Sequence, residues 1–280
     1  MKLFVFGATG FIGNYVVNRA LEKGHEVLAL VRPRTFNKFE NRHNIKIISS
    51  EILDINYKSL EGCDAIINLA ASGVSPQIST WEEMFKINVE APFKIANIAN
   101  KINIKRIVCA GTFHEYGDSA KNYEKIPPNA PLKPTSPYGI TKALSFQLLN
   151  QFAIHKKLEL VYPRIFSAYG MGQNLKNFWP SLREAALNNK DFNMTSGKQI
   201  RDFIKVEKVA EHLINACERK DIQIGNPLVI NIGSGKGLSL IDFARSQWNL
   251  FNATGNLIPG AIKDRDNPDR FIADITRLNE

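Results

Sequence analysis

The sequence has few cysteines, no long apolar run and no block of like charge. Cys63, Cys109 and Cys217 are the three cysteines among the 280 residues. An odd number at such wide spacing matches neither a disulfide framework nor a metal motif, so we expect buried thiols in a reducing cytoplasm. No apolar run reaches the roughly 18 residues of a membrane-spanning helix. The chain opens on an apolar strand, which leaves no room for a cleavable signal peptide.

Basic residues and histidines are too dispersed to define a large site. Lys and Arg number 36 against 27 Asp and Glu, which gives a formal charge of +9, yet no run holds five or more basic residues. This balance suits an anionic small ligand. It lacks the basic and aromatic platform of a nucleic-acid binder, so we expect neither a nucleic acid nor a membrane as partner. The five histidines form no cluster, and no metal site is expected.

The order of strand-like and helix-like segments predicts the fold class. Apolar runs typical of strands occupy residues 2–6, 26–31, 45–48, 65–69, 105–110 and 158–165. Helical patterns lie between them, at residues 11–23, 81–101 and 136–156. Short apolar strands that alternate with helices indicate a parallel sheet covered on both faces. The expected fold is therefore α/β, a Rossmann-type doubly wound parallel sheet.

The rhythm changes after Phe166, where Asn, Gly and Pro become denser. One later apolar run, 228–232, is expected to return to the sheet. We therefore assign residues 1–165, with about 204–234, to a dinucleotide-binding domain. Residues of about 166–203 and 235–280 are assigned to a smaller substrate-binding region over the carboxyl ends of the strands.

The first turn of the chain carries a phosphate-binding motif. It is the G-x-x-G-x-x-G sequence Gly7-Ala8-Thr9-Gly10-Phe11-Ile12-Gly13. Glycines permit a tight turn and a close approach of backbone N–H groups to a pyrophosphate, and the following helix adds its dipole. Because the motif follows a strand and opens a helix, it predicts dinucleotide binding.

The ends of the second and third strands bear on the choice of cofactor. Arg32 and Arg34 stand where an acidic residue would bind the adenosine ribose of NAD. An arginine there accepts a 2′-phosphate, so NADPH is the preferred cofactor and NAD(H) stays possible. Asp54, followed by Ile55, comes after the third strand, where a carboxylate can accept a hydrogen bond from the adenine amino group.

A possible catalytic group lies at the start of the predicted helix 136–156. Tyr138 and Lys142 are four residues apart and share one helical face. The lysine ammonium and the positive nicotinamide are expected to lower the pKa of the tyrosine, which makes it a usable acid or base. Thr112, just after the fifth predicted strand, is placed to donate a hydrogen bond to the same substrate oxygen.

Together these motifs resemble the extended short-chain dehydrogenases/reductases, specifically the NAD(P)-dependent sugar epimerase/dehydratase group. The match runs essentially end to end. Beyond the residues named above, it is carried by Asn68-Leu69-Ala70-Ala71, Asn88-Val89, Tyr116-Gly117 and residues 163–170, 201–204 and 231–235.

The resemblance implies a role for each matching residue. Thr112, Tyr138 and Lys142 are the expected catalytic triad. Further cofactor contacts are implied for Leu69, Ala70, Ala71, Asn88 and Pro163. Arg201 and Arg265 are expected to hold the diphosphate of a nucleotide sugar, since a guanidinium fork suits phosphate geometry. Other substrate contacts are expected from Phe113, His114, Arg164 and Ser167.

The residues after Thr112 bear on the reaction. Related dehydratases carry an Asp-Glu pair there, whereas this chain has Phe113 and His114. Dehydration is therefore unlikely to be its chemistry, and Arg32 disfavours a permanently bound NAD. The resemblance is strongest to the NDP-4-keto-6-deoxy-sugar 4-reductases, especially CDP-sugar reductases such as CDP-abequose synthase, which implies lipopolysaccharide O-antigen biosynthesis. A C4, or C3/C5, epimerase of the same fold is the alternative, and a non-catalytic NADPH sensor is a second.

The resemblance also implies a homodimer. Helices 81–101 and 136–156 of two chains would form a four-helix interface. Apolar positions that could serve it, or belong to the core instead, are Phe85, Phe93, Ala143, Phe146 and Leu149.

Overall fold

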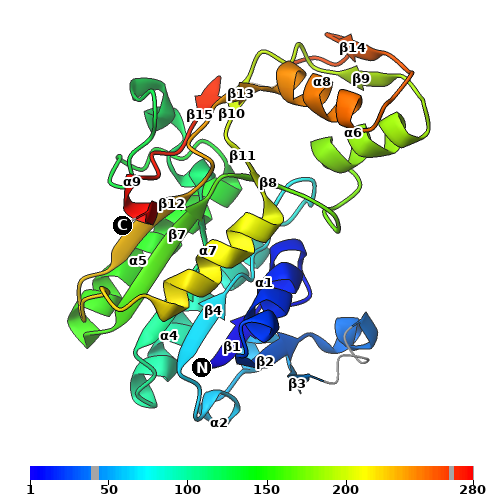
Figure 1. Ribbon diagram of the computed structural model, residues 1–280. Coiled ribbons are helices and arrows are strands. Elements are labelled where there is room, and N and C mark those ends of the chain that lie inside the picture. Colours follow the sequence, from blue (N-terminus) through cyan, green and yellow to red (C-terminus); the bar gives the residue numbers. More distant parts are fainter. Residues whose placement is uncertain (39–43, 265–267, 280) are drawn as a thin grey trace.

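The computed structural model describes residues 1–38, 44–264 and 268–279 (Figure 1). Its central sheet has the strand order β12-β7-β5-β4-β1-β2-β3, and every neighbouring pair is parallel. The strands are β1 (Lys2–Phe6), β2 (Glu26–Val31), β3 (Ile45–Ser49), β4 (Ala65–Asn68), β5 (Arg106–Cys109), β7 (Glu159–Ile165) and β12 (Leu228–Ile232). The doubly wound α/β fold and the return of segment 228–232 to the sheet are confirmed.

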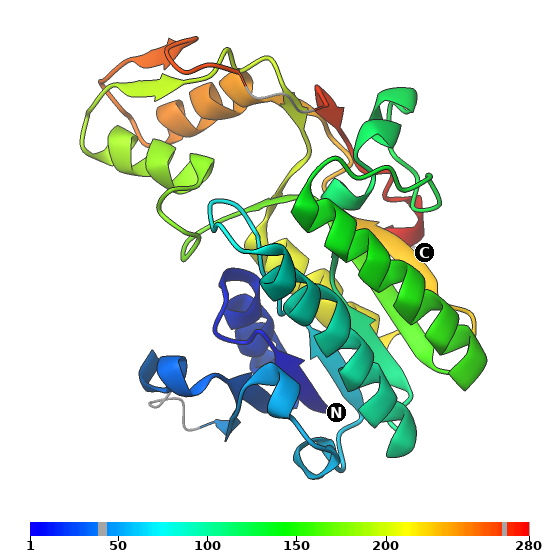
Figure 2. The ribbon, with the colours of Figure 1, turned by 180° about the vertical axis from the view of Figure 1, so that it is seen from behind.

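Helices cover both faces of this sheet. The helices α1 (Phe11–Glu22) and α7 (Val206–Glu218) pack on one face, and α4 (Ala91–Lys101) and α5 (Pro137–Lys156) on the other (Figures 1 and 2). Side chains alternate along β1, so Leu3 and Val5 join the first core while Phe4 and Phe6 join the second. All four are 0% exposed, and each such burial is worth about 1.5–3 kcal/mol.

The helix expected over residues 81–101 is continuous but irregular. It consists of α3 (Trp81–Phe85), a π-helical segment (Lys86–Glu90) and α4. Thr80 starts it with a capping box, in which its side chain accepts from the Glu83 N–H at 3.2 Å. Pro92 has no N–H for the Asn88 carbonyl, so the regular hydrogen-bond ladder is interrupted there.

A small lobe stands beyond the carboxyl ends of the sheet strands (Figure 1). It contains α6 (Phe178–Leu187), α8 (Leu240–Leu250) and the parallel pair β9 (Phe192–Met194) and β14 (Leu257–Pro259). Its core is separate from those on the sheet and includes Leu182, Ala244 and Trp248. These elements lie in the two segments assigned to substrate binding, while the division into domains stays a prediction.

Two short sheets lie where the chain passes between lobe and sheet. The pair β8 (Ser167–Tyr169) and β11 (Phe203–Lys205) is parallel, and β10 (Ile200–Arg201) lies between β13 (Leu238–Ser239) and β15 (Arg270–Phe271). Within the described residues, no helix is long and apolar enough to cross a membrane.

Candidate active site

The glycine loop after β1 forms a close-packed turn that leaves the start of α1 open. Gly7 has a φ of +76°, and a Cβ at Gly13 would lie 2.0 Å from the Gly7 carbonyl oxygen. Gly10 begins α1 with no side-chain cap. The first N–H groups of α1 have no partner within the helix, so they are available to a ligand. The loop and helix start therefore fit the pyrophosphate of a dinucleotide.

The two arginines after β2 are exposed and carry free guanidinium groups. Neither Arg32 nor Arg34 forms a side-chain hydrogen bond or ion pair with another described residue. Asp54, in the 3-10 turn Ile52–Asp54 after β3, is also exposed, whereas Ile55 is buried in the second core. Arg32, Arg34 and Asp54 are thus open to solvent at one edge of the sheet.

The side chain of Asn88 hydrogen-bonds other groups of the protein. Its Oδ1 accepts from the Ser72 N–H at 2.9 Å, and its Nδ2 donates to the Ser72 carbonyl and to Thr141 Oγ1, both at 2.9 Å. The residue is 0% exposed. The amide of Asn88 is thus fully used by protein groups in this structure, and its expected place near the nicotinamide stays a prediction. Asn88 fixes the loop after β4.

The other residues implied for the cofactor lie along the ends of the strands. Leu69, Ala70 and Ala71 follow β4 and are half-buried, directly against the glycine loop, since a Cβ on Gly7 would meet Ala70 N at 2.8 Å. Pro163 is buried within β7, opposite Ile230 of β12.

The three expected catalytic residues come together at the start of α5. Ser136 caps this helix by accepting from the Gly139 N–H at 3.2 Å, which orients its first turn with Tyr138. Lys142 is 3% exposed, and its Nζ donates to the Ala110 carbonyl at 2.6 Å, next to the short strand β6 (Gly111–Thr112). Thr112 ends that strand, and its hydroxyl hydrogen-bonds the Tyr138 side chain.

The pKa of Tyr138 departs from the expected direction. Burial, followed by the negative charge of Glu115, raises the pKa of Tyr138 above its ordinary value, and the hydrogen bond with Thr112 opposes them. In the protein by itself Tyr138 is therefore a neutral phenol, suited to donate a proton. The sequence did not predict that Glu115 is buried, because the partners that enclose it, Tyr162 and Arg164, lie more than 40 residues away along the chain.

His114 is placed beside Tyr138 as an uncharged ring. The two rings are 5.8 Å apart, and the imidazole stacks on Phe113 at 4.2 Å. Burial, helped by the nearby charge of Arg201, lowers the pKa of His114 to about 4. A neutral imidazole near pH 7 can make a polar contact but is a poor second acid.

Arg164, from which a substrate contact is expected, is buried in an ion pair with Glu115. It is 1% exposed, its Nε donates to Glu115 Oε2 at 2.7 Å, and a terminal nitrogen donates to the Pro128 carbonyl at 2.8 Å. Its guanidinium also lies 4.4 Å from the centre of the Phe146 ring. Protein groups therefore surround Arg164 in this structure, and its expected contact with the substrate stays a prediction.

Arg201 remains available to an anion. In the described part of the chain it forms no ion pair, and its guanidinium donates to carbonyl oxygens of Ile200 and Asp269. Burial lowers its pKa to about 10. Asp202, the neighbouring acid, instead accepts from backbone N–H groups of Ser234, Gly235 and Ala273. Arg265, the second arginine expected at the diphosphate, lies outside the described residues.

Phe113 and Ser167 are only partly available. Phe113 turns its ring into an apolar cluster, 4.9 Å from Phe271 and 5.6 Å from Phe166, and stays half-buried. Ser167 is also half-buried, and its N–H donates to the Asp202 carbonyl at 3.0 Å. Both side chains are uncharged, so any contact with a substrate would be apolar for Phe113 and a neutral hydrogen bond for Ser167.

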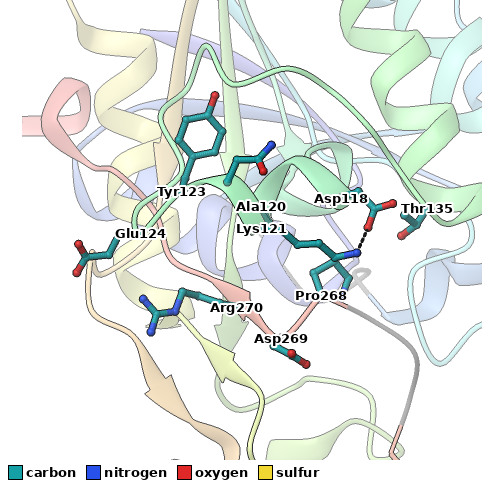
Figure 3. Close-up of a pocket in the computed structure, with 10 residues that line it drawn as sticks. Asp118, Ala120, Lys121, Tyr123, Glu124, Thr135, Pro268, Asp269 and Arg270 are labelled. Atoms are coloured by element: carbon teal, nitrogen blue, oxygen red, sulfur yellow. Dashed lines mark ion pairs between the residues drawn. The ribbon is translucent and has the colours of Figure 1, made fainter.

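A polar hollow of about 960 Å³ lies between the segment after β6 and residues 268–270 (Figure 3). The 3-10 segment Asp118–Asn122 and residues 268–270 form its walls, and Asp118 faces Lys121 in a 2.6 Å ion pair. Asp269 in this wall supplies the carbonyl that Arg201 contacts. No sequence motif had singled out these residues, because they are adjacent only in the folded chain.

The parallel sheet, the glycine loop and the Tyr-x-x-x-Lys helix define a Rossmann-type dinucleotide-binding enzyme fold. The family model described as "NAD dependent epimerase/dehydratase family" matches residues 3–233. The chain belongs to this family.

Curated relatives carry the names of nucleotide-sugar enzymes. The chain is 27% identical over 251 residues to a putative UDP-glucose 4-epimerase of Methanocaldococcus jannaschii, which covers 85% of this chain and 78% of that protein. It is 26% identical over 275 residues to the CDP-abequose synthase of Salmonella typhimurium, covering 96% and 88%.

Solved structures show the same fold. MoeE5 in complex with UDP-glucose and NAD has a TM-score of 0.84 at 25% identity, over 100% of this chain and 91% of that chain. The UDP-N-acetylglucosamine 4-epimerase of Methanobrevibacter ruminantium, in complex with UDP-N-acetylmuramic acid, has a TM-score of 0.88 at 23% identity, over 99% and 90%.

Proposed function

We propose that this protein is an NADPH-dependent reductase of a nucleotide-linked 4-keto-6-deoxy sugar. The observation that carries the proposal is the pair of exposed arginines after β2, whose guanidinium groups have no side-chain partner among the described residues. Arg32 and Arg34 offer guanidinium groups for a 2′-phosphate where an acid would favour NAD. Net reduction consumes one NADPH per turnover, so it requires a cofactor that is released and replaced. An epimerase, by contrast, keeps the same cofactor bound through its cycle.

The cofactor would lie across the glycine loop, with its pyrophosphate at the start of α1 and its adenosine toward Arg32 and Asp54. When bound, NADPH supplies the hydride for the sugar C4 carbonyl. Tyr138 donates its phenolic proton to the C4 oxygen, and Thr112 donates a hydrogen bond to the same oxygen as negative charge develops there. Lys142 holds its ammonium one helical turn away, where it can bind the nicotinamide ribose.

The raised pKa of Tyr138 supports the reductive direction. A tyrosine that stays protonated is ready to act as an acid, whereas oxidation of a hydroxyl would first require a tyrosinate. The charge of bound, oxidised nicotinamide would lower this pKa again. The neutral His114 and the apolar Phe113 offer no carboxylate for water elimination, which argues against a dehydratase.

The substrate diphosphate is assigned to Arg201, a half-buried arginine near His114 that forms no ion pair with the described residues. The sugar would then lie between Arg201 and Tyr138, next to His114. The similarity to a CDP-abequose synthase supports a 4-keto-6-deoxy sugar, and with it a role in lipopolysaccharide O-antigen synthesis. The three free, buried cysteines suit a reducing compartment, so we place the reaction in the cytoplasm.

An epimerase that retains NAD is the second candidate. It is favoured by the names of several curated relatives, which are UDP-glucose 4-epimerases. In that reaction Tyr138 would first take a proton and then return one, and no cofactor would be consumed. The stoichiometry of NADPH to product therefore separates the two functions.

The test is NADPH oxidation with a panel of CDP-, dTDP-, GDP- and UDP-linked 4-keto-6-deoxy sugars. Oxidation equal to product formed, with one member of the panel, is the expected result. The same panel should be run with NADH, and UDP-glucose should be tested for isomerisation. Formation of an isomerised product without consumption of cofactor would show that the protein is an epimerase and not a reductase.

We also propose that two chains associate through α3, α4 and α5. Of the apolar positions considered, Ala143 and Leu149 are buried core residues, whereas Phe85 on α3 is 51% exposed. Leu144 and Leu148 are 45% and 39% exposed on α5, one helical turn apart. Together these three exposed side chains supply an apolar face for a symmetric partner.

A further inference from the structure

A buried carboxylate lies directly behind Thr112. Glu115 is 0% exposed, in the 3-10 turn Phe113–Glu115 that follows β6. Its Oε1 accepts from the Thr112 backbone N–H at 2.8 Å, and its Oε2 accepts from Arg164 Nε at 2.7 Å. The carboxylate therefore fixes the backbone that carries the Thr112 hydroxyl.

The same carboxylate is connected to the helix of Tyr138 and Lys142. The Tyr162 hydroxyl lies 3.1 Å from Glu115 Oε1 and 3.1 Å from the Lys142 carbonyl oxygen. Arg164 packs its guanidinium on the ring of Phe146, which is also on α5. Glu115 thus links β6, β7 and α5, and two of these elements carry all three catalytic residues.

Glu115 is also the anionic group that acts on Tyr138. Thr112 from β6 hydrogen-bonds Tyr138, and His114 from the adjoining turn packs near its ring, with the charge of Arg201 of β10 near His114. Lys142 of α5 directs its ammonium to the Ala110 carbonyl. Thr112 is not ionisable, and His114 is neutral near pH 7. Glu115 raises the pKa of Tyr138, and its effect is second only to that of burial.

We propose that Glu115 is a positioning residue of the catalytic triad, which holds Thr112 in place, joins it to α5 and sets a fixed negative charge near Tyr138. This proposal about Glu115 depends on the proposed function in one respect, namely that Tyr138 transfers the proton. Stability by itself is a weak explanation for the Glu115–Arg164 pair, because buried ion pairs often contribute less than apolar packing of the same volume.

The test measures the tyrosine directly, without any sugar substrate. The tyrosinate absorbance of the protein saturated with NADP⁺ is followed as pH rises, and the same titration of Tyr138→Phe is subtracted to isolate Tyr138. In Glu115→Gln, the midpoint should fall by about one unit or more, since a nearby like charge has been removed. Glu115→Asp keeps the charge and should shift the midpoint less.

A matched control exists at the other end of the same strands. Glu159 of β7 pairs with Arg106 of β5 at 2.7 Å, away from the triad. Glu159→Gln removes an ion pair of the same chemistry and should leave the Tyr138 midpoint unchanged. If Glu115→Gln fails to fold, the double variant E115Q/R164M removes both charges and is read in the same titration, with a smaller fall in the same direction expected, because loss of the Arg164 cation opposes it.

An unchanged midpoint in Glu115→Gln, or in the double variant, would overturn the proposal. A fall of equal size in Glu159→Gln would also overturn it, because the effect would then be a general consequence of lost stability. The titration remains informative if no sugar in the panel is reduced. Failure of the proposed function and failure of this inference are therefore distinguishable.

Discussion

Glu115 Oε2 lies 2.7 Å from Arg164 Nε, and neither side chain is more than 1% exposed. This ion pair connects the turn after Thr112 to β7, beneath the ring of Phe146. An arginine expected to face the substrate is therefore part of the support of the triad. Breaking such a pair by removing one partner leaves a buried charge and typically costs about 3–5 kcal/mol.

Tyr138→Phe should remove most of the turnover and leave cofactor binding intact. The change deletes only the hydroxyl that donates the proton, while Lys142 and the glycine loop remain. We expect turnover to fall by at least about 100-fold, with the NADPH dissociation constant within about twofold of wild type. Steady-state kinetics and a fluorescence titration measure the two quantities, and near-normal turnover would remove Tyr138 from the mechanism.

Arg32→Ala should weaken NADPH binding and leave NADH binding nearly unchanged. Loss of charge-assisted hydrogen bonds to a 2′-phosphate costs about 1.5–3 kcal/mol, or roughly 10- to 100-fold in affinity. Arg34→Ala should have a smaller effect in the same direction. Dissociation constants for both cofactors measure this preference. Equal losses for NADH and NADPH would show that Arg32 does not read the phosphate.

Acid should destabilise the protein through His114. Its pKa is lowered to about 4 in the fold from about 6.5 in an unfolded chain, so the unfolded state binds the proton more readily. The stability that depends on a neutral His114 is complete above pH 6.5 and is lost progressively as pH falls toward 4. By pH 5 the loss is about 2 kcal/mol. Denaturant unfolding at pH 7 and pH 5 should show a smaller loss for His114→Asn than for wild type.

Asp202→Asn should destabilise the connection between sheet and lobe. The buried carboxylate accepts from the Ser234 hydroxyl and from backbone N–H groups of Ser234, Gly235 and Ala273. An amide NH₂ would face some of these donors, which costs about 2–4 kcal/mol. Asp221→Asn is the control, because Asp221 is exposed and water screens its ion pair with Arg219. Equal shifts in urea unfolding would contradict this assignment.

Leu144→Glu should dissociate the proposed dimer. A symmetric interface would bury the new carboxylate of each copy on the proposed apolar face, where it would lose its water. Leu250→Glu on α8 is a matched control, since Leu250 is more exposed, at 68%, and lies on the lobe. Sedimentation velocity should give monomers for Leu144→Glu and dimers for Leu250→Glu. A dimer that persists in Leu144→Glu would place the interface elsewhere.

The predicted elements agree closely with the structure where the pattern is strong. The strands at 2–6 and 26–31 have the predicted bounds, and Ser136 and Pro137 begin α5 as expected. Secondary-structure propensity and hydrophobic periodicity depend on residues that are close in sequence, so the sequence is sufficient to predict these elements. The π-helical segment at Lys86–Glu90 was missed because its apolar pattern is indistinguishable from that of a regular helix.

The site was predicted less completely than the fold. The glycine loop and the pair Tyr138 and Lys142 are short-range motifs, and the structure places Thr112 against Tyr138 as expected. Asn88 and Arg164 were assigned to cofactor and substrate from the resemblance to the epimerase/dehydratase family. Both are covered by protein partners that lie 16 or more residues away in sequence.

The sequence by itself determined the order of strands and helices, the phosphate loop and the spacing of Tyr138 and Lys142, because hydrophobic periodicity, glycine turns and helical repeats depend on neighbouring residues. Only the tertiary structure decided which polar groups stay free. Burial and long-range pairing determine the charge state of Tyr138, the neutrality of His114 and the engagement of Arg164. These properties arise where β6, β7 and α5 meet, at residues that are not neighbours along the chain.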